Sequence, residues 1–149
     1  MLGILAACNS SVVVEKHVTL TQGQWNLQQV PAFEFTIQDT NATYQVDYII
    51  ENTLDYPFYN LYVRYECFDP SGKIVASQLQ HVLLFEEKSG KPIGKPDWKA
   101  KNFTADLVAI PALKFKTPGK HTFKLTQYMR QNPLKAVNKV GIRIQKTRL

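Results

Sequence analysis

The chain has 149 residues, of which 44% are hydrophobic, 11% aromatic and 20% charged. This length and composition fit one globular domain and exclude a disordered chain. The two cysteines, Cys8 and Cys67, are too few for a disulfide scaffold or a four-cysteine metal site. Beyond the N-terminal run, no stretch approaches the ~20 apolar residues of a membrane-spanning helix.

The net charge is +6, but the charges are unevenly distributed along the chain. Residues 1–87 hold three basic and ten acidic residues, whereas residues 88–149 hold fifteen basic and two acidic ones. If early and late strands interleave in one sandwich, the two halves partly neutralise each other. The alternative is a basic face that meets an anionic surface, such as lipid phosphates or an acidic partner.

A lipidation signal occupies the N-terminus. An apolar run ends in Leu5-Ala6-Ala7-Cys8, which matches the lipobox of bacterial lipoproteins. The small alanines let a membrane peptidase approach and cut the backbone before Cys8. The thiol of Cys8 takes a diacylglycerol, and the amine that the cut frees can take a further acyl chain such as palmitate. Two or three acyl chains give stable attachment to a bilayer. The alternative is an ordinary N-terminal strand that carries a free cysteine.

This signal sets the expected boundaries and location. We expect residues 1–7 to be the remnant of a signal peptide, residues 8–16 a lipidated tether, and residues 17–149 a single β-sandwich domain. The apolar run is short and no basic residue precedes it, so we expect the true start codon upstream. No aspartate follows Cys8 to retain the protein in the inner membrane. The outer membrane, on its periplasmic face, is therefore favoured, and export argues against a nucleic-acid partner.

Apolar and polar residues alternate with period two along most of the chain, which predicts antiparallel sheets that share a core. Turn-forming residues separate the runs at 39–41, 69–72 and 117–120. The pattern predicts an all-β fold, an antiparallel β-sandwich of immunoglobulin-like or jelly-roll-like type. The expected strands are residues 33–38, 44–51, 61–67, 113–115, 123–126 and 140–145.

Three connections have more specific predictions. The turn at 69–72 is expected to join strands 59–68 and 73–85 as a hairpin. Residues 86–102 form the longest loop, and it is rich in lysine. Near the C-terminus, Asn132 as a cap, Pro133 in the first position and a shared face of Leu134 and Val137 predict one short helical turn.

No catalytic or metal site is expected, so we predict neither an enzyme nor a cofactor. Cys67 falls on the apolar side of its strand and is expected to be a buried, inert thiol; pairing it with Cys8 would require Cys8 to be unmodified. The adjacent acidic pair at 86–87 points to opposite faces of a strand, so it cannot act as paired carboxylates. The histidines are far apart and share no ligand spacing: His17, His81 and His121.

Two groups of residues are candidates for contacts with a partner or glycan. The aromatic run 56–62 fits either sheet core with cross-strand pairs or a platform that stacks on sugars. Trp98 lies among lysines in the long loop, where it either folds back as an anchor or contacts a membrane interface or a partner. The candidate contact residues are Tyr56, Phe58, Tyr59, Trp98, Lys95 and Lys99.

Several short segments share a distinctive order and spacing: residues 52–61, 68–73, 89–95, 119–123, 127–130 and 140–144. Together they resemble the gliding-motility lipoprotein family GldH of the Bacteroidetes. The resemblance implies lipidation of Cys8 and a non-catalytic accessory role in surface gliding, a process linked to a protein-secretion machine. This chain departs from the family after Lys95, where residues 96–100 replace a glycine and an acid, so the partner or its affinity is expected to differ.

The first hypothesis is therefore a non-enzymatic, membrane-anchored lipoprotein that serves as an accessory or structural component of the gliding and secretion machinery. It is expected to meet the membrane through its lipid and to bind other envelope proteins, while its oligomeric state is left open by the sequence. The alternative is a carbohydrate-binding envelope lipoprotein. That alternative requires several of the candidate aromatic side chains to be exposed together.

Overall fold

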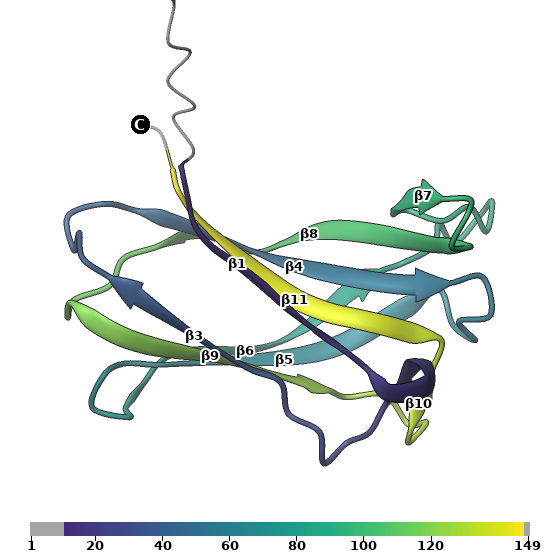
Figure 1. Ribbon diagram of the computed structural model, residues 1–149, viewed down its shortest axis with the longest axis horizontal. Coiled ribbons are helices and arrows are strands. Elements are labelled where there is room, and N and C mark those ends of the chain that lie inside the picture. The colour runs from purple at the N-terminus through teal and green to yellow at the C-terminus, as the bar shows by residue number, and fades with distance from the viewer. Residues whose placement is uncertain (1–10, 148–149) are drawn as a thin grey trace, which may run out of the picture.

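The computed structural model describes residues 11–147 of the chain (Figure 1). Residues 1–7 and Cys8, with the lipobox, lie outside the described range. The only helical element described is a three-residue 3₁₀ turn, η1 (Thr21–Gly23), and within residues 11–147 no helix could span a membrane. The strands are β1 (Val12–Thr19), β2 (Gln24–Trp25), β3 (Ala32–Ile37), β4 (Tyr44–Thr53), β5 (Asn60–Phe68), β6 (Ile74–Leu83), β7 (Lys95–Asp97), β8 (Asn102–Leu113), β9 (Gly119–Gln127), β10 (Leu134–Lys135) and β11 (Val137–Lys146).

Two antiparallel sheets pack face to face, which confirms the predicted antiparallel β-sandwich. The first sheet has the strand order β1-β11-β4-β8-β7, and the second has the order β3-β9-β5-β6. In Figure 1 the second sheet lies below the first, and the small ribbon of β10 and β2 lies at the lower right. Each sheet therefore contains both early and late strands, as the interleaving interpretation of the charge pattern expects.

The core forms where the inner faces of the two sheets meet. It arises because apolar and polar side chains alternate along the strands. On β5, Leu61, Val63 and Cys67 are fully buried while Tyr62 between them is exposed. Because successive side chains of a strand point to opposite faces, one face of β5 lines the core and the other faces solvent. Phe115, which was expected in a strand with Leu113, instead follows β8 and is buried by packing its ring against Tyr44, 5.3 Å between centroids.

Strand β8 is longer than the sequence predicted because a bulge hides its alternation. The register with β4 shifts between Val46, paired with Ile110, and Asp47, paired with Val108. Ala109 is the extra residue, and both it and Ile110 are buried although they are adjacent. A bulge places two successive residues opposite one partner and interrupts the period of two, which is why only the end of this strand was predicted.

The predicted hairpin at 69–72 is confirmed, since it joins β5 to β6. The carboxylate of Asp69 accepts hydrogen bonds from the N–H groups of Ser71 and Lys73, at 2.9 and 3.0 Å, and from the Ser71 hydroxyl. These bonds fix the turn, and they hold the pKa of Asp69 below its ordinary value, with the Ser71 hydroxyl as the largest cause. The loop predicted at 86–102 is not continuous, because it contains β7, which pairs with β8.

The predicted helical turn near the C-terminus is wrong. Leu134 lies in β10, its backbone pairs with Trp25, and its side chain is fully buried. Ala136 has a φ of 62°, a left-handed conformation that a right-handed helix cannot contain. Asn132 does not cap a helix; its side-chain oxygen accepts a hydrogen bond from the N–H of Leu27, at 2.9 Å.

The predicted tether also needs a correction. Strand β1 begins at Val12 and pairs with β11 from Val12 to Thr19, so residues 12–16 belong to the sandwich. Only the residues before Val12 remain as a possible tether. The alternation on β1 is weak because it is an edge strand with one neighbour, and Val14 and Val18 are its only partly buried apolar residues that pack on the core.

The sandwich has two ends, and the register assigns each connection to one of them. The N-terminal end is where β1 begins; it carries the turns 38–43, 69–73 and 114–118. The opposite end carries the turn 54–59 and the connections 84–94, 98–101 and 128–133. Figure 1 shows the turns of the N-terminal end at the left and β7 with its loop at the right.

Candidate functional site

Tyr56 belongs to the core and is not available as a stacking platform. Its side chain is 5% exposed, and its hydroxyl donates a hydrogen bond to the backbone oxygen of Asn60, at 2.7 Å. Its ring stacks on Phe85 with 6.3 Å between centroids. Burial raises the pKa of Tyr56, so the hydroxyl stays protonated and donates. The role of Tyr56 is therefore to close the core beneath the turn 54–59.

Phe58 and Tyr59 are both exposed, but they serve different surfaces. The backbone oxygen of Tyr59 accepts hydrogen bonds from Leu84 and Phe85, at 2.9 and 3.1 Å. A side-chain hydrogen bond with the Glu87 carboxylate raises the pKa of Tyr59. Phe58 instead lines a hollow on the outer face of the second sheet. The structure thus does not bring Tyr56, Phe58 and Tyr59 together as one platform.

A different aromatic surface, which sequence reasoning missed, surrounds Phe58. We call it the outer aromatic surface; it comprises Phe58, Tyr62, His81 and Tyr128. Tyr62 stacks on His81 with 4.8 Å between centroids, and its backbone oxygen accepts a hydrogen bond from Tyr128. The guanidinium of Arg64 lies 5.3 Å from the centre of the Tyr128 ring. Phe58 and Tyr62 belong to the aromatic run 56–62, but strand pairing is needed to bring His81 and Tyr128 beside them.

Trp98, Lys95 and Lys99 lie together at the opposite end of the sandwich. Lys95 is an exposed residue of β7, and Trp98 and Lys99 begin the turn that follows it. The Asp97 carboxylate accepts hydrogen bonds from the backbone N–H groups of Lys99 and Ala100, both at 3.1 Å, which fixes the turn. Trp98 is 73% exposed and touches the buried core only edge-on. It is therefore a solvent-facing ring on an ordered turn.

The sequence expectation for Cys67 is confirmed: its side chain is fully buried. Burial raises the pKa of the Cys67 thiol to about 12, so the thiol is protonated and unreactive at neutral pH. His17 and His81 are exposed on separate strands and His121 is buried on β9. Across residues 11–147, no three His, Cys, Asp or Glu side chains are grouped as metal ligands would be.

The fold and these surfaces define an antiparallel β-sandwich domain that displays exposed aromatic and basic side chains. The sequence model of the family described as "GldH lipoprotein" matches residues 12–144, and the chain belongs to that family. A relative named "Gliding motility lipoprotein GldH homolog", from Christiangramia forsetii, is 24% identical over 151 residues, which covers 97% of this chain and 90% of the relative. The resemblance expected from the sequence is confirmed.

Solved structures share only a general likeness. One is a family GH115 4-O-methyl-α-glucuronidase, 12% identical, with a TM-score of 0.44; the match covers 89% of this chain and 16% of that one. Another is the VP2 subviral particle of infectious bursal disease virus, 12% identical, with a TM-score of 0.41; it covers 89% of this chain and 32% of that one. This chain spans a small part of both proteins, and neither likeness supports a functional argument.

Proposed function

We propose that the protein is a lipid-anchored, non-enzymatic component of the gliding machinery and its associated secretion apparatus in the cell envelope. The family match over residues 12–144 supports this proposal most directly, because it links the chain to gliding motility lipoproteins. Cys8 is the proposed attachment site, in the only lipobox of the sequence. The residues before Cys8 are the proposed signal remnant, and residues 8–11 are the proposed tether.

The position of β1 gives the proposed anchor a geometric consequence. Val12 is the fourth residue after Cys8, so a fully extended chain places the lipid within about 14 Å of the first strand. Strand β4 has ten residues and runs between the two ends, a length of about 33 Å at the usual rise per residue. The anchored end is thus the N-terminal end, and Trp98 lies far from the bilayer.

This orientation favours protein partners at the opposite end. A tether that short confines the protein to two dimensions and raises its effective concentration toward other membrane components. Exposed Trp98, with Lys95 and Lys99 beside it, presents an aromatic ring within a basic rim, the composition of a protein contact. We propose that envelope motility or secretion proteins bind there, and that the anchor lies in the outer membrane on its periplasmic face.

The anchor is tested by Cys8→Ala in the native host. We expect the variant to lose metabolic labelling with palmitate, to move from the membrane to the soluble fraction, and to abolish gliding on agar. Cys67→Ala is the matched control, because Cys67 is the other cysteine of the chain and is fully buried. That control should keep its label and its membrane fraction.

Two outcomes would refute the proposal. A Cys8→Ala protein that folds, is soluble and supports full gliding would show that tethering is unnecessary. Labelling that depends on Cys67 would place the lipid on the wrong cysteine. Density fractionation of inner and outer membranes tests the location separately. A photo-crosslinker at position 98, compared with one at position 62, tests which surface meets the protein partner.

The outer aromatic surface gives the alternative, carbohydrate binding, a specific basis. Tyr62 and Tyr128 are exposed next to each other, and Phe58 adds a third ring beside a hollow of about 350 Å³. Aromatic faces of this kind stack on the apolar faces of sugars. We expect the double variant Tyr62→Ala, Tyr128→Ala to lose glycan-array binding if this function is real, and Trp98→Ala to keep it. If the native protein binds no glycan on the array, the carbohydrate-binding alternative is refuted.

A further inference from the structure

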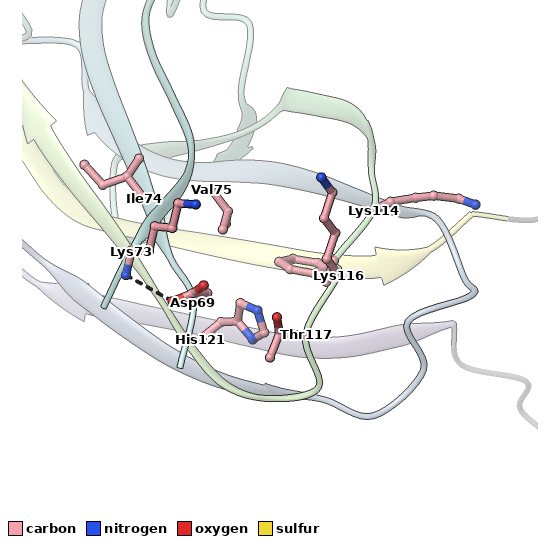
Figure 2. A pocket seen from close by; sticks show the side chains of 9 residues that line it. Asp69, Lys73, Ile74, Val75, Lys114, Lys116, Thr117 and His121 are labelled. Carbon is pink, nitrogen blue, oxygen red and sulfur yellow. Dashed lines mark hydrogen bonds between the residues drawn. The ribbon is translucent and has the colours of Figure 1, made fainter. Parts of the chain in front are cut away.

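We propose that a lysine-walled cavity at the N-terminal end binds the phosphate headgroups of anionic lipids in the membrane that holds Cys8. This inference rests on the proposed function only for the position of the membrane, which the anchor at Cys8 sets. The residues that form the cavity all belong to the described part of the chain. Its volume is about 370 Å³, large enough for a headgroup. Two connections form it, the turn between β5 and β6 and the segment between β8 and β9, as Figure 2 shows.

The segment after β8 presents two lysines because the residue between them is buried. Phe115 packs its ring edge-on against Phe35, Tyr44 and the buried His121, with centroids 4.8 to 5.8 Å apart. Lys114 and Lys116 flank Phe115 and are both exposed. The buried ring therefore fixes the backbone that carries both ammonium groups. His121 is held in turn, since its Nδ1 lies 3.0 Å from the backbone oxygen of Gly119.

The third lysine, Lys73, lies on the opposite wall of the cavity, in the turn between β5 and β6. Lys73 follows Asp69, whose carboxylate accepts the backbone N–H of Lys73 and two hydrogen bonds from Ser71. Figure 2 shows Lys73 and Lys116 on opposite sides of the cavity, with Asp69, Thr117 and His121 below them and Lys114 pointing away. Lys73 and Lys116 therefore flank the cavity against one carboxylate, which the turn already engages, and Lys114 adds a further positive charge beside it.

These three lysines lack the partners that other lysines at this end have. Lys120 pairs with Glu34 at 3.1 Å and Lys146 pairs with Asp39 at 3.3 Å. Among the described residues, no carboxylate lies within 4.0 Å of the ammonium groups that line the cavity. An anion bound between them would restore charge balance where the protein supplies too little negative charge.

Exposed apolar residues next to the lysines point to a membrane rather than to a soluble anion. Ile74 and Val75 line the same cavity and are 48% and 46% exposed. Val12 and Val13, where the chain emerges toward Cys8, are also exposed. Basic groups at headgroup level with aliphatic side chains beside them are the composition of an interfacial membrane contact.

The strand register places this cavity close to the surface of the membrane that holds Cys8. Val12 pairs with Gln145 on β11, β11 pairs with β4, and Tyr44 of β4 pairs with Leu113, the residue before Lys114. Three strand spacings thus separate Val12 from the cavity wall, about 14 Å at the same end of the sheet. A bilayer that holds Cys8 therefore lies next to Lys73, Lys114 and Lys116.

The test uses the full chain with Cys8→Ser, which carries no lipid, so its outcome does not depend on lipidation. Binding is measured by sedimentation with vesicles of phosphatidylcholine that contain increasing phosphatidylglycerol. Pure phosphatidylcholine controls for insertion of the apolar residues 1–7. We expect the double variant Lys73→Ala, Lys116→Ala to bind roughly 30-fold more weakly, since each lysine at an anionic surface contributes about a fivefold factor.

The matched control is the double variant Lys95→Ala, Lys99→Ala, which removes the same charge from the opposite end. We expect its binding to stay close to that of the parent at 0.1 M salt, where charges farther away than about 10 Å are screened. Equal losses in the two double variants would mean that net charge alone drives binding, and the cavity assignment would fail. Binding that does not rise with phosphatidylglycerol would also overturn it.

A second arm separates lipid from free anion. Inorganic phosphate is titrated calorimetrically into the same protein without vesicles, and we expect no saturable binding. Saturable binding that the Lys73, Lys116 double variant abolishes would assign the cavity to a soluble phosphate and overturn the membrane proposal. The proposed anchor is judged separately, by mass spectrometry of Cys8 in the native protein, so failure of either proposal can be recognised independently.

Discussion

A glutamine between the two sheets offers a sharp test of how the sandwich is held together. Gln80 is on β6, and its side-chain oxygen accepts a hydrogen bond from the hydroxyl of Tyr48 on β4, at 2.5 Å. Its side-chain amide donates to the backbone oxygen of Ala109, at 2.7 Å. Ala109 is the extra residue of the β8 bulge, so this hydrogen bond supplies a partner that the bulge removes from the ladder. Burial raises the pKa of Tyr48, which keeps the hydroxyl protonated as a donor.

The change Gln80→Ala leaves two buried groups without partners, the Tyr48 hydroxyl and the Ala109 carbonyl. Each unsatisfied buried group costs about 1–3 kcal/mol. Gln80 itself is only partly buried, so water reaches part of the site. We therefore expect a loss in the lower half of the combined range, about 3 kcal/mol in the free energy of unfolding. For a chain of this length that corresponds to a fall in Tm of about 6–12 °C.

Chemical denaturation and calorimetry of the unlipidated protein measure this loss. Gln78→Ala is the matched control, because Gln78 lies two residues earlier on the same strand and is exposed; it should change the free energy of unfolding by less than about 0.5 kcal/mol. In a Tyr48→Phe background, Gln80→Ala should cost about 1 kcal/mol less, because one of the two groups is already absent. Equal effects of Gln78→Ala and Gln80→Ala, or no coupling to Tyr48, would refute the bridging role.

Three further predictions concern other parts of the sandwich. Gly141→Ala should lower stability by about 1–3 kcal/mol and speed proteolysis within β1, because an added Cβ would clash with the backbone of Lys16 and His17 and push β1 off β11. Cys67 should resist maleimide at pH 8 in the native protein and react quickly in denaturant, because burial raises its pKa to about 12 and leaves almost no thiolate in the folded state. Arg143→Met should cost about 1 kcal/mol at low salt and less at high salt, because Arg143 pairs with Glu15 at 2.8 Å and Asp106 at 3.4 Å on a partly exposed face.

The outcomes that contradict these predictions are equally specific. A stable Gly141→Ala protein with a protected β1 would show that β1 and β11 accommodate the added Cβ without separating. Native reaction of Cys67 at the rate of a free thiol would show that the core opens around it. A salt-independent loss for Arg143→Met would mean that its aliphatic stem, not its charge, packs against the sheet.

Local patterns in the sequence are sufficient to predict the class of the fold and the position of the proposed anchor. A period of two in the hydrophobic pattern is a local property, so strands such as β5 and β11 could be predicted without knowing their neighbours. The hairpin at 69–72 was predictable for the same reason, because the turn chemistry of Asp69 and Gly72 acts over four residues. Lipidation at Cys8 is likewise predicted from adjacent residues alone.

Which side chains reach solvent together could not be predicted from local patterns and depends on the folded arrangement of the strands. Tyr56 and Phe58 are two residues apart in one aromatic run, yet one closes the core and the other lines a surface hollow. Leu134 lies in a strand rather than a helix because Trp25, more than a hundred residues earlier, supplies its backbone partner. The outer aromatic surface and the lysine-walled cavity both arise where distant segments meet. Such contacts depend on strand order and register, which local patterns do not encode, because pairing is chosen by the burial of the whole core.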